Sequence, residues 1–322
     1  MSGKLLQVDG LQVRFGSAKR PLRAVDSLSF DLQHGESLGL VGESGCGKST
    51  TARAIVGLAK IHAGSITLEG RSVTTAKERA RERMPQRVQM VFQDPYGSLN
   101  PRMTAFDLVT EPLRIAAKLA KHERRIEATR LMLQVGLDPR FLNRYPHEFS
   151  GGQRQRIGIA RALALDPKLV LLDEPVSALD VSIQAQVLNL LARLREERGL
   201  SYLFIAHDLA VVRHLCDRVA VMYLGRIVEV GAKRAVFAAP RHPYTRALLS
   251  AVPIPDPRQA RAQRRVLLSG DPPSPDREPI GCAFATRCPK VQERCRREQP
   301  SLDGDASATA TGSHAVSCFY PD

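Results

Sequence analysis

The stretch Gly42-Glu43-Ser44-Gly45-Cys46-Gly47-Lys48-Ser49 fits the pattern GxxxxGK[ST] at every fixed position. A short apolar run, Leu38 to Val41, precedes it, and helical sequence follows from Lys48. In a strand–loop–helix setting, the glycines let backbone N–H groups turn inward, and the helix N-terminus faces the anion that they surround. The sequence therefore predicts a nucleotide phosphate site within an α/β fold.

Each position of this loop has an expected role. Lys48 reaches the β- and γ-phosphates, the Ser49 hydroxyl ligates Mg²⁺, and Thr50 assists from the next position. Cys46 stands at a variable position and is expected to be incidental to the chemistry. The expected nucleotide-binding residues of this stretch are Gly42, Glu43, Ser44, Gly45, Cys46, Gly47, Lys48, Ser49 and Thr50.

A second motif supplies carboxylates for this site. The run Leu169-Val170-Leu171-Leu172 is continuously apolar, which is typical of a strand buried on both faces, and it ends in Asp173 and Glu174. Asp173 is expected to hold Mg²⁺ through water, and Glu174 to orient and deprotonate the attacking water. Asp-Glu after an apolar run often merely ends a strand, but a complete phosphate loop upstream favours the catalytic interpretation.

Composition limits the class of protein. The 322 residues can bury one large core plus a smaller module, and no apolar run approaches the roughly 18–20 residues that cross a bilayer. The N-terminus shows no secretory signal, so we expect the protein to stay in the cytoplasm. The formal charge of +14 suits an anionic partner, such as nucleic acid or a membrane leaflet, or simply a solvated basic surface, and charge alone does not decide.

Strand and helix patterns alternate along the chain. Leu5 to Phe15 alternates apolar and polar residues as a half-buried strand does, whereas Ile183 to Leu194 repeats apolar residues at helical spacing up to Gly199. Tyr202 to Ile205 predicts the next buried strand. Such alternation predicts a parallel sheet covered by helices. From about Asp94 to Glu148, a pattern rich in Lys, Arg and Glu predicts a helical insertion.

The C-terminal part has a different character. After about Pro240 the chain shows no clear periodicity, and Asp271-Pro272-Pro273-Ser274-Pro275 predicts a stiff linker. Four of the six cysteines follow, and in a reducing cytosol such a cluster suggests metal rather than disulfides. Four thiolates suit an iron–sulfur cluster or structural zinc, with His314 as a further zinc ligand; unligated thiols are the third alternative. Zinc sites usually show a tight C-x₂₋₄-C pair, which this sequence does not have.

One more motif indicates the family. Phe149-Ser150-Gly151-Gly152-Gln153 resembles the signature of ABC ATPases, usually LSGGQ, with Phe149 in place of Leu. Gln93 resembles the Q-loop glutamine of that family, Ser177-Ala178-Leu179-Asp180 its D-loop, and His207 its switch histidine. With the two motifs above, these elements follow the family order over about residues 1–235.

The resemblance implies that two ATPase subunits enclose two ATP molecules. Ser150, Gly151, Gly152 and Gln153 would then face the γ-phosphate of the ATP held by the second subunit, because a helix start exposes N–H groups to an anion. Asp180 would belong to the D-loop, and Gln93 would join Ser49 and Asp173 around Mg²⁺. His207, which alone reads as an ordinary strand-end histidine, would contact the γ-phosphate and orient Glu174. The implied catalytic residues are Glu174, His207, Gln93 and Lys48.

Adenine usually stacks on an aromatic residue upstream of the phosphate loop in this family. Phe30 shares a face with Leu28 and Leu32, which favours the core. Phe15 matches the family position better, although it could equally complete the face of Leu11 and Val13. We expect Phe15 to stack on adenine and Val25 to pack against the base edge or ribose.

Three stretches narrow the resemblance, namely Gln93 to Pro101, Glu174 to Ser182 and Arg241 to Thr245. They resemble the ATPase subunits of bacterial dipeptide, oligopeptide and nickel importers, which use two different ATPase subunits. The Gly-Gly-Gln of the signature and the Val-Ser after Pro175 resemble the second of these, the F-type subunit. That implies a heterodimer with a second ABC ATPase subunit, two transmembrane permeases and an extracytoplasmic solute-binding protein, with no nucleic acid partner. The chain would lie peripherally on the cytoplasmic face of the inner membrane. In those subunits, cysteines like Cys282, Cys288, Cys295 and Cys318 hold a [4Fe–4S] cluster, here expected to be structural.

The expected fold class is α/β, with an ABC-type P-loop ATPase core, an antiparallel β subdomain, a helical subdomain and a small cysteine-bearing extension. The expected domains are residues 1–240, with the helical subdomain at about 94–150, and residues 241–322. The expected function is hydrolysis of ATP, with Mg²⁺, that closes and reopens the ATPase dimer and so drives import of di- or oligopeptides or a related small solute. The alternatives are an exporter motor and a soluble ABC ATPase that acts on nucleic acid. The cysteine-bearing tail argues against the first, and the lack of a long coiled coil or tandem ATPase domains against the second.

Overall fold

The computed structural model describes residues 3–17, 20–252, 268, 270, 273, 280–302 and 314–322. Except for Pro273, the predicted 271–275 linker lies outside these residues. The chain divides into two compact units. The first comprises Met1–Gln33, Ser37–Glu78 and Ile205–Asp322, and the second comprises His34–Glu36 and Arg79–Phe204. The domain boundaries proposed from the sequence stay predictions.

An antiparallel sheet opens the first unit, with strand order β2-β1-β4-β5. β1 (Lys4–Ser17) pairs with β2 (Arg20–Gln33), and β4 (Ala63–Leu68) pairs with β1 and with the short β5 (Arg71–Ser72). The alternation seen in the sequence is the burial pattern of β1, whose apolar residues from Leu5 to Val13 have no exposed surface. The expected antiparallel β subdomain is therefore confirmed.

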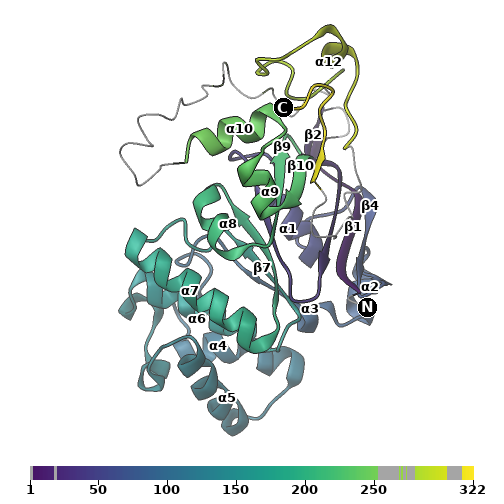
Figure 1. Ribbon diagram of the computed structural model, residues 1–322. Helices are drawn as coiled ribbons and strands as arrows, with labels where there is room; N and C mark the ends of the chain where they lie inside the picture. The colour runs from purple at the N-terminus through teal and green to yellow at the C-terminus, as the bar shows by residue number, and fades with distance from the viewer. Residues whose placement is uncertain are drawn as a thin grey trace. The chain divides into compact units, whose positions relative to one another are not determined.

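Strands that carry the phosphate loop form the other sheet of the first unit, in the order β11-β10-β9-β3. β3 (Ser37–Val41) runs parallel to β9 (Arg218–Tyr223), which pairs antiparallel with β10 (Arg226–Ala232). Figure 1 shows β9 and β10 side by side near the yellow C-terminal segment. That segment contains β11 (His314–Val316), which adds to β10 with Ala315 opposite Val230.

Helices of the first unit follow these strands. α1 (Lys48–Val56) begins at the phosphate loop, α8 (Leu209–Leu215) precedes β9, and α9 (Lys233–Ala238) follows β10. α10 (Pro243–Ser250) and α12 (Glu293–Arg297) lie in the region where the sequence shows no periodicity. At eight, five and three residues, α10, α12 and β11 are too short for a repeat to become visible.

The second unit holds the carboxylate strand. β6 (Val88–Val91) runs parallel to β7 (Leu169–Asp173), and β8 (Ser201–Ala206) is next to β7, with the unit boundary falling within β8. α6 (Gly151–Leu163) and α7 (Val181–Arg198) flank β7 in the chain. Gly199 ends α7 in the left-handed conformation, with φ of 63°, as the sequence predicts.

The predicted helical insertion is present in this unit. It contains α4 (Ala105–Pro112), the π-helix η1 (Leu113–Ala117) and α5 (Lys121–Gln134), followed by the 3₁₀ turns η2 (Pro139–Asn143) and η3 (Pro146–Glu148). Two further helices, α2 (Ala76–Arg81) and α3 (Met84–Arg87), precede β6.

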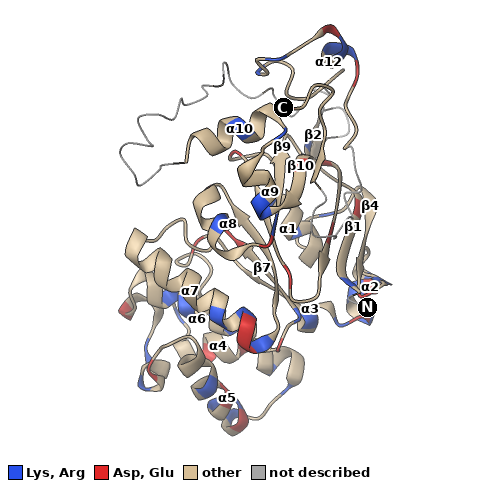
Figure 2. Ribbon diagram, viewed as in Figure 1, with Lys and Arg blue, Asp and Glu red and all other residues tan. Residues whose placement is uncertain are grey.

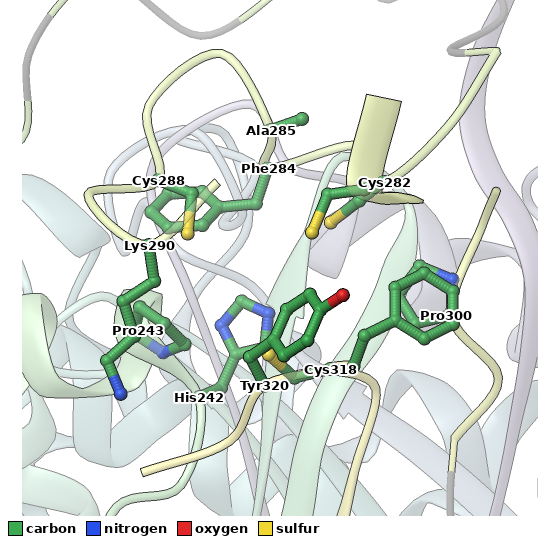
Figure 3. A pocket seen from close by; sticks show the side chains of 12 residues that line it. His242, Pro243, Cys282, Phe284, Ala285, Cys288, Lys290, Pro300, Cys318 and Tyr320 are labelled. Atoms are coloured by element: carbon green, nitrogen blue, oxygen red, sulfur yellow. The ribbon is translucent and has the colours of Figure 1, made fainter. Parts of the chain in front are cut away.

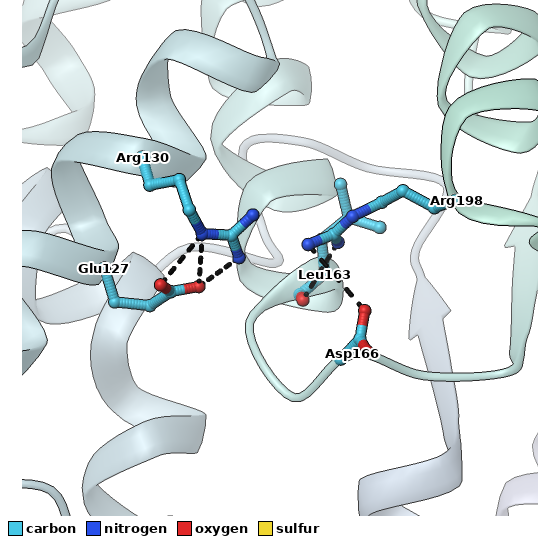
Figure 4. A network of polar contacts seen from close by, with 5 residues as sticks. All are labelled: Glu127, Arg130, Leu163, Asp166 and Arg198. Carbon is cyan, nitrogen blue, oxygen red and sulfur yellow. Dashed lines mark hydrogen bonds and ion pairs between the residues drawn. The ribbon is translucent and has the colours of Figure 1, made fainter.

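Figure 4 shows an ion pair within α5 and the contacts made by the last residue of α7. In α5, Arg130 Nε donates to both carboxylate oxygens of Glu127 at 3.0 and 2.9 Å, and this bond lowers the pKa of Glu127. Arg198, at the end of α7, donates to the carbonyl of Leu163 at 3.4 Å and pairs with Asp166 at 3.7 Å. These contacts join the end of α7 to the turn between α6 and β7.

No helix in the described part of the chain is long and apolar enough to cross a membrane. Basic side chains occur on elements of both units, including α5, α9 and α12 (Figure 2). The positive charge is therefore spread over several elements.

Candidate functional site

The phosphate loop is enclosed by backbone from two neighbouring strands. A Cβ at Gly47, where φ is 106°, would lie 2.0 Å from the carbonyl oxygen of Ala24 in β2. A Cβ at Gly42 would lie 2.2 Å from the carbonyl oxygen of Met222 in β9. The Gly225 N–H also donates to the carbonyl of Cys46 at 2.9 Å. Only glycine fits at these two points, so the curl of the loop is fixed by its surroundings.

The Lys48 side chain is held by hydrogen bonds to the backbone of this loop. Its Nζ donates to the carbonyls of Gly42 and Glu43, at 2.8 and 2.9 Å, and the residue is only 4% exposed. Ser49 and Thr50 follow in the first turn of α1 and are half-buried. Cys46 is buried, and burial raises the pKa of its thiol.

The two residues expected near the base differ sharply in exposure. Phe15 lies opposite Leu22 near the end of the β1–β2 hairpin and is 46% exposed, whereas Leu11 and Val13 have no exposed surface. Phe15 therefore does not complete their apolar face. Val25, which pairs with Val13, is buried.

A hydrogen bond joins two predicted catalytic residues in the second unit. Gln93 follows β6, and its Nε2 donates to Oε2 of Glu174 at 2.8 Å. Asp173 ends β7 and is 1% exposed. Glu174 has φ of 46°, which strains a non-glycine residue by about 1–3 kcal/mol. Its carbonyl accepts the N–H and the hydroxyl of Ser177, at 3.2 and 3.1 Å, which stabilises the turn.

The segment after Gln93 packs on the signature helix. The guanidinium of Arg154 lies 4.0 Å from the ring centroid of Tyr96. Arg161 of the same helix, α6, donates to the carbonyl of Ser98 at 2.9 Å. These contacts link the Q-loop to the helix that begins at the signature motif.

The signature motif forms the start of α6 through a capping box. Ser150 is the N-cap, its Oγ accepts the Gln153 N–H at 3.3 Å, and the Gln153 side chain accepts the Ser150 N–H at 3.0 Å. The Gln153 side chain therefore caps the helix, a role that the sequence analysis did not assign to it. The first N–H groups of a helix have no partner within it, so those of Gly151 and Gly152 are the donors expected to meet an anion.

Gly152 also sets the distance between the signature helix and the helix after the D-loop. A Cβ at this position would lie 2.4 Å from Cγ2 of Ile183 in α7. Asp180 immediately precedes α7, and its carbonyl accepts the Gln184 N–H at 2.8 Å. The Gln184 side chain donates to the carbonyls of Val176 and Leu179, at 3.0 Å each, and so holds the D-loop.

The predicted residues thus fall into two sets. The first unit holds Phe15, Val25, the phosphate loop, Lys48, Ser49 and Thr50, together with His207, which follows β8 and is exposed. The second unit holds Gln93, Asp173, Glu174, residues 150–153 and Asp180.

All four C-terminal cysteines line one pocket of the first unit, together with His242 and Phe284. Figure 3 shows Cys282, Cys288 and Cys318 directing their sulfur atoms toward a common space. Burial, with the neighbouring thiols, raises the pKa of Cys282 to about 11, and burial also raises the pKa of Cys288 and Cys318. Four thiols are a donor set that either an iron–sulfur cluster or a zinc ion takes.

A single metal ion fits this pocket less well. Among the residues that the structure describes, no group of three or more His, Cys, Asp or Glu side chains is placed to hold a metal ion. His314, the further ligand expected for zinc, instead lies with Nε2 2.5 Å from Oε1 of Glu229. The tight convergence that zinc needs is therefore not seen in this part of the chain.

Two residues of the C-terminal region contact the phosphate loop, and the sequence analysis assigned no role to either. Arg287, next to Cys288, forms two hydrogen bonds with the carboxylate of Glu43, at 2.8 and 3.2 Å. Tyr244 of α10 accepts the Glu43 N–H with its hydroxyl at 2.9 Å. Both partners are more than 200 positions away in sequence, at separations of 244 and 201. Such contacts cannot be predicted from a local sequence pattern.

Comparison with known proteins assigns families to both parts of the chain. The family described as ABC transporter matches residues 25–177, and the one described as oligopeptide/dipeptide transporter, C-terminal region, matches residues 228–295. The oligopeptide transport ATP-binding protein OppF of Salmonella typhimurium is 52% identical over 99% of this chain and 96% of its own length. AppF of Bacillus subtilis, also an oligopeptide transport ATP-binding protein, is 50% identical over 92% of this chain and 89% of its own length.

Solved structures share the fold of the ATPase part. A dimeric ATP-binding cassette in a post-hydrolysis state, bound to ADP and Pi, is 29% identical, with a TM-score of 0.64. The similarity covers 71% of this chain and 99% of that one. The cbiO1 component of a Clostridium perfringens ABC transporter has the same TM-score at 26% identity, over 73% of this chain and 91% of its own. The expected ABC ATPase fold is thereby confirmed.

Proposed function

This chain belongs to the ABC transporter family of ATPases, in the group with the oligopeptide/dipeptide transporter C-terminal region, and we propose that it powers the import of short peptides. The observation that carries the proposal is the 52% identity to an oligopeptide transport ATP-binding protein over 99% of the chain, which includes the C-terminal region. The reaction is hydrolysis of ATP to ADP and phosphate. The proposed domains are residues 1–240, with a helical subdomain at 94–150, and the extension at 241–322.

Nucleotide binding is assigned to the first unit. The backbone of residues 42–47 surrounds the phosphates, and Lys48, held by two carbonyls, presents its ammonium to the β- and γ-phosphates. Phe15 stacks on adenine, which its 46% exposure supports, and Val25 borders the base or ribose. Thr50, at the next position, assists in binding the nucleotide.

Magnesium would be held by Ser49, Gln93 and Asp173. The Gln93 amide nitrogen is engaged by Glu174, so its amide oxygen is the atom available to an ion. Asp173 is a buried carboxylate at a strand end, a donor that Mg²⁺ prefers. When bound, Mg²⁺ neutralises charge on the phosphates.

Hydrolysis is assigned to Glu174 as the general base. Its carboxylate is held by Gln93 in the second unit, and its backbone is fixed in the left-handed conformation. The base removes a proton from the attacking water while the water oxygen bonds to the γ-phosphorus. The bond from the γ-phosphorus to the bridging oxygen breaks, and that oxygen leaves with ADP. By the resemblance to ABC ATPases, His207 is assigned to the γ-phosphate and to the orientation of Glu174.

A second ABC ATPase subunit would complete each site. Ser150 and the N–H groups of Gly151 and Gly152, at the start of α6, face the γ-phosphate of the ATP on that subunit, beside Asp180 of the D-loop. The Gln153 side chain supports this arrangement as a cap. We propose a heterodimer on two transmembrane permeases at the cytoplasmic face of the inner membrane, supplied by an extracytoplasmic solute-binding protein.

The four-cysteine pocket would hold a [4Fe–4S] cluster on Cys282, Cys288, Cys295 and Cys318. The support is that one pocket collects four thiols and that four cysteine thiolates are the usual ligands of such a cluster. Such a cluster would crosslink segments of the extension that have little regular structure.

The test is transport by the assembled complex in proteoliposomes. Labelled dipeptides, longer peptides and Ni²⁺ are offered on the side of the solute-binding protein, with ATP on the other side. The proposal predicts ATP-dependent peptide uptake that Lys48→Ala abolishes. ATP-driven efflux would support the exporter alternative, and ATPase activity of the lone chain stimulated by DNA or RNA would support the nucleic-acid alternative.

A further inference from the structure

We propose that Arg287 and Tyr244 are positioning residues for the phosphate loop, acting through Glu43 on Lys48. This inference rests on the proposed function, because it assigns to the C-terminal region a part in nucleotide binding. The four residues all lie in the first unit.

Glu43 is the point where these contacts meet. Its carbonyl accepts from Lys48 Nζ at 2.9 Å, and its N–H donates to the Tyr244 hydroxyl at 2.9 Å. Its carboxylate accepts two bonds from Arg287, at 2.8 and 3.2 Å. Its carbonyl also accepts the Cys46 N–H at 3.3 Å. Every polar group of Glu43 is therefore engaged, and two of its four partners, Tyr244 and Arg287, belong to the C-terminal region.

Charge gives the Arg287 contact a second effect. A carboxylate inside a phosphate-binding loop repels the polyphosphate that the loop binds. The Arg287 side chain is 8% exposed and that of Glu43 is 30% exposed, so water screens their pairing only in part. Arg287 thus neutralises this carboxylate while holding its residue in place.

Both positioning residues pack against an aromatic cluster formed by Tyr223, Tyr244 and Phe284. Tyr244 has no exposed surface, and its ring centroid lies 4.7 Å from that of Tyr223 and 5.5 Å from that of Phe284. Arg287 follows Phe284 in a turn, donating its N–H to the Phe284 carbonyl at 3.0 Å. Phe284 also lines the four-cysteine pocket. The same aromatic cluster therefore borders the cysteines and the residues that hold the loop.

The experiment is a double-mutant cycle on nucleotide affinity, with the full chain in its assembled complex. The variants are Arg287→Met, Glu43→Gln and their combination, and the probe is displacement of a fluorescent ATP analogue by ATP and by ADP. Arg287→Met should raise the Kd for ATP about tenfold, since a charge-assisted bidentate pair is lost and a negative charge is left in the loop. In the Glu43→Gln background, where that charge is absent, Arg287→Met should change the Kd much less.

A matched control tests whether the effect is local. Arg297→Met also removes one arginine from the same region, but Arg297 is exposed and pairs with Glu293 at 2.7 Å. It should leave the Kd for ATP unchanged. Arg287→Lys keeps the charge but not the two-bond geometry. Its Kd for ATP should lie between that of the wild type and that of Arg287→Met.

Tyr244→Phe provides an independent arm, because it removes only the hydroxyl and keeps the buried ring. It should raise the Kd for ATP severalfold. If Arg287→Met does not fold, the affinities of Tyr244→Phe and Arg287→Lys test the proposal in its place. Equal losses for Arg287→Met in both Glu43 backgrounds, or unaltered affinity in Arg287→Lys and Tyr244→Phe, would overturn the inference. Failure of the wild-type complex to bind ATP would instead overturn the proposed function.

Discussion

The side-chain amide of Gln93 and the carboxylate of Glu174 form a 2.8 Å hydrogen bond at the ends of the neighbouring strands β6 and β7. This bond connects the segment that packs on the signature helix to the residue proposed as the general base. A displacement of Gln93 would therefore shift or break its hydrogen bond to the Glu174 carboxylate.

The first prediction concerns Glu174. Glu174→Gln should lower the rate of ATP hydrolysis by the complex about 10²–10⁴-fold, because the amide cannot take a proton from water. ATP affinity should remain close to that of the wild type, and the closed, ATP-bound dimer should accumulate. Single-turnover phosphate release and equilibrium ATP binding provide the two measurements. Phosphate release at the wild-type rate would remove Glu174 from its proposed role.

Phe15 provides a prediction about the base. Phe15→Ala should raise the Kd for ATP by the loss of stacking, which is worth roughly 1–3 kcal/mol per base. Phe15→Trp should restore affinity, because it keeps an aromatic face. Leu22→Ala is the matched control, since Leu22 is the cross-strand neighbour of Phe15 and is 39% exposed. Equal effects of the Phe15 and Leu22 substitutions to alanine would show that the hairpin, and not the ring, matters.

A third prediction separates the two half-sites of the chain. Ser150→Arg should impair mainly the site built on the partner's phosphate loop, because it blocks the start of α6. Lys48→Ala should impair mainly the site built on this chain's own loop. The double variant should damage both. The measurement is single-turnover hydrolysis with nucleotide occupancy resolved at each site. An isolated chain, verified as monomeric, that matched the rate of the complex would contradict the composite-site proposal.

The cysteine pocket gives a fourth prediction. Protein purified without oxygen should be brown and contain about four irons per chain with labile sulfide. Cys288→Ser should lose the colour and make the C-terminal region easier to proteolyse. Cys216→Ala is the control, because Cys216 is a buried thiol that lies outside the pocket, and it should keep the iron. Stoichiometric zinc without sulfide would show that the cluster assignment is wrong.

Local patterns sufficed for much of the fold. The phosphate loop, the strand that ends at Asp173 and the helix that ends before Gly199 each depend on residues within a few positions of one another. Their glycines, apolar runs and helical repeats therefore appear directly in the sequence. The resemblance to ABC ATPases supplied the remaining site residues, which periodicity alone would not single out.

Long-range and context-dependent features were beyond such reasoning. The short helices and strand after Pro240 carry too few residues for a repeat, and β11 forms only by pairing with a strand more than eighty positions earlier. The capping role of Gln153 depends on where α6 begins, and the exposure of Phe15 depends on where the hairpin leaves the core. The contact of Arg287 with Glu43 depends on the complete fold of the first unit.

The order of synthesis adds a consequence to these contacts. Glu43 leaves the ribosome early, whereas Tyr244 and Arg287 follow 201 and 244 positions later. A nascent chain therefore carries a complete GxxxxGK[ST] sequence long before the residues that hold it in place have been made. Closing so long a loop is entropically costly and comes late in folding. Full affinity for nucleotide should then arise only after Tyr244 and Arg287 have been made and have reached Glu43.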